Sequence, residues 1–281
     1  MTGVPDLPAD ATSEMLADWA ELSVALAVDA MSRGDMATIA LRQGLDGGET
    51  TVAGAWAILE ARQELYGGRA PLSITEDGYL ASDPKQADLK KWHGFLSWLA
   101  IGGEIDHEAR EVFEECVAEI AGGLTGGPHL RLGAPRRTPV PKSLQEAIAL
   151  YGEESVERTM LIEVPAPDDK DMGLDVVSWA DFGDRRGASL HLIGQCASGA
   201  HWQEKVSQLS VAFWSDYVHW GVKPSRFFAI PFVVEDPHEL HRLSRKAGLI
   251  LDRPRLVGLA SRQHISASVM ARVGGILATV A

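Results

Sequence analysis

Two short apolar runs, separated by a polar stretch, constrain the fold of this chain more than any other feature. Residues 174–179 and 190–195 are rich in β-favouring side chains, whereas residues 180–188 are rich in Gly, Asp and Arg. This pattern predicts a β-hairpin with a longer loop. A hairpin centred on Arg185 places Asp175 opposite Gln195, and directly opposed residues of an antiparallel pair point to the same face. We therefore expect a carboxylate and a side-chain amide to meet there.

The polar ends of these runs have two interpretations. An Asp and a Gln on neighbouring strands are usually ordinary polar positions, so the spacing alone does not indicate catalysis. Both residues border hydrophobic strands, however, and polar groups in such places cost free energy unless they have partners. A carboxylate and an amide oxygen, with the lysine Lys205 just beyond, could form a hydrolytic site for a hard metal ion.

The same segment resembles a known family. Residues 171–175 read Asp-Met-Gly-Leu-Asp, and the second predicted strand ends in Gln195-Cys196. This is similar to the core of the PD-(D/E)xK nuclease superfamily, in particular the Mrr-like restriction endonucleases, whose strands read D-G-G-x-D and then (E/Q)-x-K. Phe-Glu-Glu at 113–115, on a predicted helix, resembles the F-E pair that opens the Mrr-like domain. The resemblance covers residues 108–235, under half of the chain, and its motifs are short.

The sequence departs from the family at one position. Where the family has a lysine two residues after the Glu or Gln, this chain has Ala197, and the nearest lysine is Lys205 at the start of a predicted helix. In some members of the superfamily a neighbouring element supplies the lysine, so Lys205 is the candidate substitute. If Lys205 does not act in this way, the chain is a degenerate relative that does not cut.

The resemblance implies a specific activity and a specific set of residues. The activity is hydrolysis of DNA phosphodiester bonds with Mg²⁺ or Mn²⁺, in a prokaryotic restriction or anti-phage defence setting. The metal lowers the pKa of a bound water. Lys205 would orient that water or neutralise the transition state. Asp171 would hydrogen-bond to the metal ligands or replace one of them; the alternative is a solvated aspartate in the turn before the strand. We expect Asp175→Ala to abolish cleavage with little change in melting temperature. The implied metal ligands are Glu114, Asp175, Gln195 and a backbone carbonyl near Cys196.

An alternative of a different class is a catalytically degenerate nuclease-fold protein that acts as a DNA- or protein-binding subunit of a defence complex. Two observations favour it: Ala197 at the lysine position, and a formal net charge of −13. Affinity for the phosphate backbone comes from Lys and Arg, so the acidity counts against DNA binding. Binding of Mg²⁺ or Mn²⁺ at millimolar concentration discriminates the two hypotheses.

The remaining bulk properties predict an ordinary cytoplasmic protein. Hydrophobic residues make up 46% of the chain and charged residues 23%, which is typical of globular proteins. Cys116 and Cys196 are far apart, lie in apolar contexts and are expected to be buried thiols in a reducing cytosol. The sequence shows neither a signal-peptide pattern nor an apolar run of membrane-spanning length. DNA is the expected partner, protein partners and a homodimer are compatible with the family, and no membrane contact is expected.

A length of 281 residues allows two domains. In residues 1–103 we expect helices from Ser13, over 36–41 and over 52–66, then a hairpin at 71–75 and 78–81. This order resembles a winged-helix domain. Because the region lacks a basic recognition helix, protein contact is favoured there over DNA contact. Residues 89–101 carry an aromatic stripe that indicates core packing.

In residues 104–281 we expect a restriction-endonuclease-like domain with the element order αβββαβ, so the fold class is mixed α/β (α+β). A helix covers 107–120, and the first strand is either 130–132 or 160–164. A long amphipathic helix is predicted over 202–220, a strand over 226–234 and a helix over 237–248. A last helix is expected over 260–273.

Two stretches concentrate positive charge. Residues 122–142 contain three arginines and a lysine without an acidic residue, which indicates either a solvated loop or an arm that contacts phosphates. The second stretch would form a basic edge able to hold DNA or an acidic protein. It comprises Arg242, Arg245, Lys246, Arg253, Arg255 and Arg262.

Overall fold

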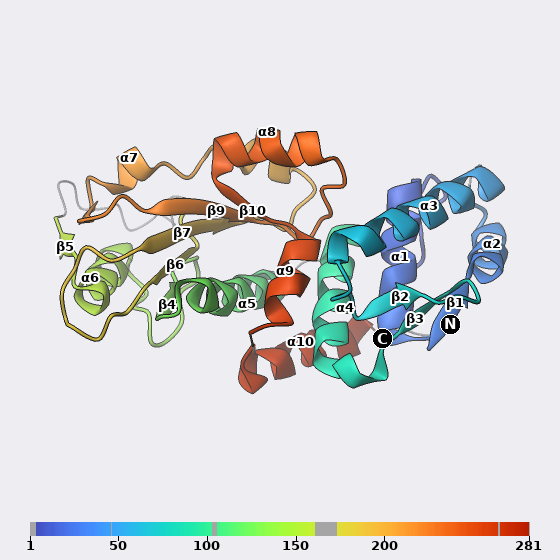
Figure 1. Cartoon of the computed structure of the whole chain (residues 1–281), viewed down its shortest axis with the longest axis horizontal. Coiled ribbons are helices and arrows are strands. Elements are labelled where there is room, and N and C mark those ends of the chain that lie inside the picture. Colours follow the sequence, from blue (N-terminus) through green and yellow to red (C-terminus); the bar gives the residue numbers. More distant parts are fainter. Residues whose placement is uncertain (1–3, 46, 103–105, 161–172, 264, 281) are drawn as a thin grey trace.

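The computed structural model describes residues 4–45, 47–102, 106–160, 173–263 and 265–280 (Figure 1). Asp171 and residues 161–164 of one predicted strand lie outside these described residues. Helices and a mixed β-sheet make up the structure, so the mixed α/β class is confirmed. The predicted domain boundary after residue 103 stays a prediction.

The first part of the chain combines helices with a small antiparallel sheet. In order it contains α1 (Ser13–Leu26), β1 (Ala30–Ser32), α2 (Arg33–Arg42), α3 (Gly48–Tyr66), β2 (Leu72–Ile74), β3 (Tyr79–Ser82), the 3₁₀ turn η1 (Pro84–Gln86) and α4 (Ala87–Ile101). The sheet order is β1-β3-β2, with both pairings antiparallel. All three predicted helices and the hairpin are present.

Local capping explains where the first helices begin. The Thr12 hydroxyl accepts a hydrogen bond from the Met15 N–H and so starts α1. A capping box starts α2: Ser32 accepts from the Asp35 N–H, and the Asp35 carboxylate accepts from the Ser32 N–H. Hydrogen bonds from the Ser32 hydroxyl and, to a smaller extent, from the Ser32 N–H hold the pKa of Asp35 below its usual value. Both caps are readable from the sequence.

The second part surrounds a five-stranded sheet with helices. Before the hairpin come α5 (His107–Thr125), β4 (His129–Arg131), α6 (Leu144–Ser155) and β5 (Arg158–Thr159). The hairpin strands are β6 (Val176–Trp179) and β7 (His191–Cys196). After it come η2 (Trp202–Lys205), α7 (Val211–Trp214), β8 (Val218–His219), β9 (Ser225–Ala229), α8 (Pro237–Ala247), β10 (Leu249–Leu251), α9 (Arg253–Ala260) and α10 (Ala267–Val280).

The sheet has the order β10-β9-β7-β6-β4. Strands β4, β6 and β7 are antiparallel neighbours, whereas β9 and β10 run parallel to β7. Figure 1 shows α8 above the sheet and α5 below it. Successive residues of β6 point to opposite faces of the sheet and so pack in different cores. Val176 packs in the cluster that contains α5 residues, and Val177 packs with residues of α6. Of the two predicted first strands, the one near 130–132 is present as β4.

The hairpin has the predicted register. Val176 pairs with Gly194 and Trp179 with His191, so the register continued by one residue sets Asp175 opposite Gln195. Arg185, the predicted centre, adopts a left-handed conformation with φ of 54°. The prediction of a hairpin centred there is therefore confirmed.

The predicted long helix over 202–220 is wrong. The structure has the short elements η2, α7 and β8 in its place. Between η2 and α7 the chain makes contacts outside any helix: the Leu209 carbonyl accepts a hydrogen bond from Arg226, and the Ser210 hydroxyl caps α7. The predicted helix over 260–273 also divides, into α9 and α10 with residues 261–266 between them.

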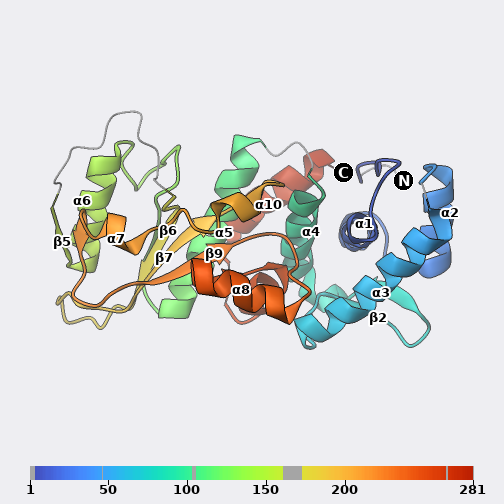
Figure 2. The same cartoon turned by 90° about the horizontal axis from the view of Figure 1, so that it is seen from above.

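The two parts of the chain meet along α4, which contacts α1, α9 and α10 (Figure 2). The aromatic stripe on α4 is buried there, as predicted. An ion cluster lies at the same junction. Arg253 is fully buried and contacts Asp18 at 2.9 Å and Glu21 at 2.6 Å, and Arg62 contacts the same two carboxylates at 2.6 and 3.0 Å. The assignment of Arg253 to an exposed basic edge is therefore wrong.

In the part of the chain that the structure describes, no helix has both the length and the apolar character required to cross a membrane.

Candidate functional site

A cavity of about 350 Å³ opens where α5 faces the end of β7 and the η2 segment. Five residues predicted from the sequence line it together, although they come from four separate stretches of the chain. These residues are Glu114, Asp175, Gln195, Cys196 and Lys205. We call this cavity the cleft. The sixth predicted residue, Asp171, lies outside the described residues.

Asp175 is fixed at the point where three strands meet. Its carboxylate Oδ2 accepts a hydrogen bond from the Cys196 N–H at 2.7 Å, and its carbonyl accepts from the Leu132 and Gly133 N–H groups at 2.7 and 3.1 Å. The residue is 7% exposed. Removal of a buried acceptor leaves a donor unsatisfied, which costs about 1–3 kcal/mol. The expectation that Asp175→Ala leaves the melting temperature almost unchanged therefore needs correction, and Asp175→Asn is the milder substitution.

Gln195 lines the cleft with an amide whose two ends differ. Its Nε2 donates to Gln208 Oε1 at 3.0 Å, whereas its Oε1 is buried and has no hydrogen-bond partner among the described residues. An unsatisfied buried acceptor is unfavourable unless a ligand satisfies it. Gly173 leaves room beside this amide: its φ is 76°, and an added Cβ would lie 3.3 Å from Nε2.

Glu114 is placed by α5 on the side of the cleft opposite the hairpin. Arg131 lies 3.5 Å from its carboxylate, and a Cβ on Gly133 would collide with that carboxylate. The neighbouring residues of the Phe-Glu-Glu motif are placed differently, although Phe113 also borders the cleft. Phe113 is 1% exposed in the core, and Glu115 forms an ion pair with Arg272 of α10. Of the two adjacent glutamates, Glu114 is thus the one in the cleft.

Sequence reasoning missed Glu111, a second carboxylate in the cleft wall. It precedes Glu114 by three residues, a spacing that places two side chains on one helical face, so the signal was present. Glu111 is 3% exposed and lies 2.6 Å from Arg137, whose pKa is raised by this hydrogen bond and charge. Arg272 and Arg131 also lie within 4.0 Å of it.

Carboxylate and carbonyl oxygens contact all three arginines of residues 122–142. Arg131 and Arg137 are bound to carboxylates of α5, and Arg131 also donates to the carbonyl of Pro135 at 2.7 Å. Arg136 is 7% exposed and donates to the Lys142 carbonyl at 3.1 Å. The three arginines are therefore held by protein oxygen atoms, although Arg137 and Lys142 remain exposed to solvent. The choice between a solvated loop and an arm that contacts phosphates stays a prediction.

Ala197 stands at the position where the nuclease family has its lysine. Ala197 is 2% exposed and packs in the apolar cluster beneath α8, so a lysine at this position would have to enter that core. Lys205 ends η2, is exposed and lines the cleft. A lysine amine is therefore available to the cleft from a neighbouring element.

The donor chemistry of the cleft suits a hard cation. Two carboxylates and an amide oxygen are ligands that Mg²⁺ and Mn²⁺ accept. Among the described residues, no group of three or more His, Cys, Asp and Glu side chains is arranged to hold a metal ion. The fit therefore depends on Gln195, whose buried Oε1 has no hydrogen-bond partner in the described part of the chain. His238 and His241 of α8 are exposed and belong to no such group either.

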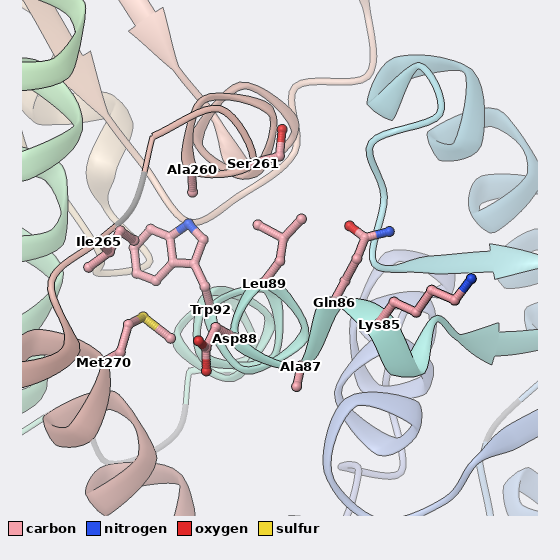
Figure 3. Close-up of a pocket in the computed structure, with 10 residues that line it drawn as sticks. All are labelled: Lys85, Gln86, Ala87, Asp88, Leu89, Trp92, Ala260, Ser261, Ile265 and Met270. Carbon is pink, nitrogen blue, oxygen red and sulfur yellow. The ribbon is translucent and has the colours of Figure 1, made fainter.

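A second cavity, of about 380 Å³, lies at the junction between α4, α9 and α10 (Figure 3). Figure 3 shows Trp92 and Leu89 of α4 beneath α9, with Met270 of α10 beside Trp92. The lining contains none of the predicted site residues, and Trp92 is 1% exposed. The chemistry-bearing side chains are thus gathered in the cleft instead.

Comparison of the chain with protein-family models, with curated proteins and with solved structures gives no match.

Proposed function

We propose that this protein is a metal-dependent deoxyribonuclease of the PD-(D/E)xK type, in a prokaryotic restriction or anti-phage defence setting. The observation that carries the proposal is the convergence of Glu114, Asp175, Gln195, Cys196 and Lys205 on one cleft. The order α5, β4, β6, β7, β9 also supports it. This order agrees with the αβββαβ core, apart from α6 and β5, which are inserted after β4, and the short elements that replace the second helix.

The residues of the cleft have distinct roles in this proposal. Glu114, Asp175 and Gln195 hold Mg²⁺ through oxygen atoms, with the backbone near Cys196 beside them. The bound ion supplies charge stabilisation and a water of lowered pKa. The Cys196 N–H fixes the Asp175 carboxylate at 2.7 Å, so that this ligand is oriented before metal arrives. Lys205 orients the attacking water or neutralises charge that develops on the phosphate.

For the first part of the chain we propose a winged-helix-like unit that contacts protein. The element order and the sheet order β1-β3-β2 support the fold. The charge supports the partner: the exposed face of α3 carries Glu49, Glu60 and Glu64, and the one basic residue of this helix, Arg62, is buried in the ion cluster. An acidic helix of this kind repels the phosphate backbone.

A cleavage assay on supercoiled plasmid with Mg²⁺ or Mn²⁺ tests the nuclease. We expect the wild type to nick the plasmid. Loss of one ligand charge in Asp175→Asn, or of the cation in Lys205→Ala, should lower the rate by about 10²–10³-fold, as the loss of one electrostatic contact does in other enzymes. Lys223→Ala, which alters an exposed lysine away from the cleft, should cut like the wild type.

The degenerate, non-cutting protein is the second candidate, favoured by the burial of Ala197 at the lysine position. No cleavage by the wild type with either metal, together with no metal binding in calorimetry, would establish this candidate and reject the nuclease. Equal cleavage by the wild type and by Asp175→Asn would also reject the assigned site.

A further inference from the structure

Gln208 is a residue of the cleft wall that the resemblance does not include. It lies in the segment between η2 and α7, lines the cleft, and accepts a hydrogen bond from Gln195 Nε2 at 3.0 Å. It is 13 residues from Gln195 along the chain, so this contact joins two separate elements.

In this contact the Gln195 amide adopts one of its two orientations. A side-chain amide has an acceptor oxygen on one edge and a donor NH₂ on the other. Because Gln208 presents its own oxygen, it satisfies the NH₂ edge and leaves Oε1 as the edge without a partner among the described residues. A metal cation requires oxygen, and an amide turned the other way would present N–H groups to it.

The segment that carries Gln208 is held at both ends. The Gln208 N–H donates to the Lys205 carbonyl at 3.0 Å, and the next residue, Leu209, accepts from Arg226 of β9 at 2.8 Å. Gln208 thereby ties the turn that bears Lys205 to the end of β7. One residue is placed to affect both the orientation of a metal ligand and the position of the cleft lysine.

We propose that Gln208 is a positioning residue that orients Gln195 Oε1 toward the metal site and holds the Lys205 turn against the cleft. This inference deepens the proposed nuclease function and rests on it. Gln208 touches neither metal nor substrate in this role; it acts through Gln195.

Calorimetric titration of the full chain with Mn²⁺ and with Mg²⁺ tests the orientation without any cleavage. We expect Gln208→Ala to weaken metal binding by about 10-fold, the lower end of the effect of residues that orient metal ligands. In a Gln195→Glu background both oxygens of residue 195 are acceptors, so orientation matters less. The same Gln208→Ala change should then weaken binding by less than about 3-fold, a coupling that identifies the Gln195 amide as the target.

Controls separate this inference from the function on which it rests. Gln203→Ala removes an exposed glutamine of η2 and should bind metal like the wild type. Equal affinity of the wild type and Gln208→Ala would overturn the positioning role and leave the nuclease proposal standing. Equal weakening in both backgrounds would overturn it too, because the loss would then come from the fold. Absence of metal binding by the wild type itself would reject the nuclease and this inference together.

A second measurement needs no metal. In the metal-free protein, the Gln195 side-chain NH₂ resonances, identified by their loss in Gln195→Glu, should move in Gln208→Ala and stay in place in Gln203→Ala. Unchanged resonances in Gln208→Ala would show that the hydrogen bond does not form in solution, and would overturn the inference.

Discussion

His191 is a fully buried imidazole whose two nitrogens have different partners. Nδ1 lies 2.7 Å from the Tyr151 hydroxyl, and Nε2 lies 3.2 Å from Glu157. Trp220 donates to the Tyr151 oxygen at 2.9 Å, so the tyrosine proton is directed to Nδ1. Nε2 therefore carries the proton that faces Glu157, and a neutral imidazole satisfies every contact. Burial lowers the pKa of His191, against the opposing charge of Glu157.

This pKa makes stability depend on pH. Because the pKa of His191 is lower in the folded than in the unfolded chain, folding favours the neutral form. The associated stability is present above pH 6.5, about the unfolded pKa, and is lost as the pH falls below it, at up to about 1.4 kcal/mol per pH unit. Urea denaturation between pH 8 and pH 5 should show this slope in the wild type and a smaller slope in His191→Gln, which cannot titrate. His93 is also buried with a lowered pKa, but it is present in both proteins, so its contribution to the slope is the same in each. Parallel curves would contradict the prediction.

The two cysteines differ in access. Cys116 is fully buried in the core, where burial raises the pKa of its thiol, whereas Cys196 is partly exposed and lines the cleft. The expectation that both are buried is thus correct for Cys116 alone.

We expect iodoacetamide to modify one thiol of the native protein and two of the unfolded protein, because only the exposed thiol can form an accessible thiolate. Mass spectrometry counts the adducts, and Cys196→Ser should leave the native protein unmodified. Modification of Cys116 at the same rate as Cys196 would contradict the burial described here.

At the scale of elements, the hairpin was predictable because residues close together in the sequence determine its pairing. Alternation of side chains and the position of the polar stretch fix the pairing, and the register joins Asp175 to Gln195 without reference to the rest of the chain. The helix caps at Thr12 and Ser32 are local in the same way. Four of the cleft residues followed from short motifs that the hairpin and α5 carry.

The segment after the hairpin was not predictable for the opposite reason. Its apolar spacing indicates a helix, but Leu209 and Gln208 satisfy their polar groups with Arg226 and Gln195. The ring contacts of Phe213, Trp214 and Tyr217 then form one aromatic group. Tertiary contacts of this kind override helix propensity. They also explain why Gln208 escaped notice, since no sequence pattern connects it to Gln195.

At the scale of the whole molecule, the ion cluster joins the two parts of the chain. Arg62 of α3 and Arg253 of α9 share the carboxylates of Asp18 and Glu21 on α1. Burial alone would raise the pKa of Asp18, but the charges of Arg253 and Arg62 hold it below its usual value. Arg253 is 235 residues from Asp18 along the chain. The charges of its sequence neighbours therefore could not reveal that a distant carboxylate neutralises Arg253.

Removal of one cation from this cluster should destabilise the protein strongly. Arg253→Met leaves buried carboxylates with half of their counter-charge, and loss of one partner of a buried ion pair costs about 3–5 kcal/mol. Urea denaturation measures the change in the free energy of unfolding. Arg245→Met, at an exposed position of α8, should change it by less than about 0.5 kcal/mol. Addition of Glu21→Gln to Arg253→Met should recover part of the loss; a single variant as stable as the wild type would show that the cluster does not hold the junction.

The core at this junction contains residues from nearly the whole length of the chain, from Leu22 through α4 and α5 to Leu277 of α10. A ribosome delivers these residues in order, so the apolar faces of α4 and α5 are complete long before α10 exists to cover them. Over the same interval Asp18, Glu21 and Arg62 lack Arg253. The nascent chain therefore completes this central packing only after α10 has emerged.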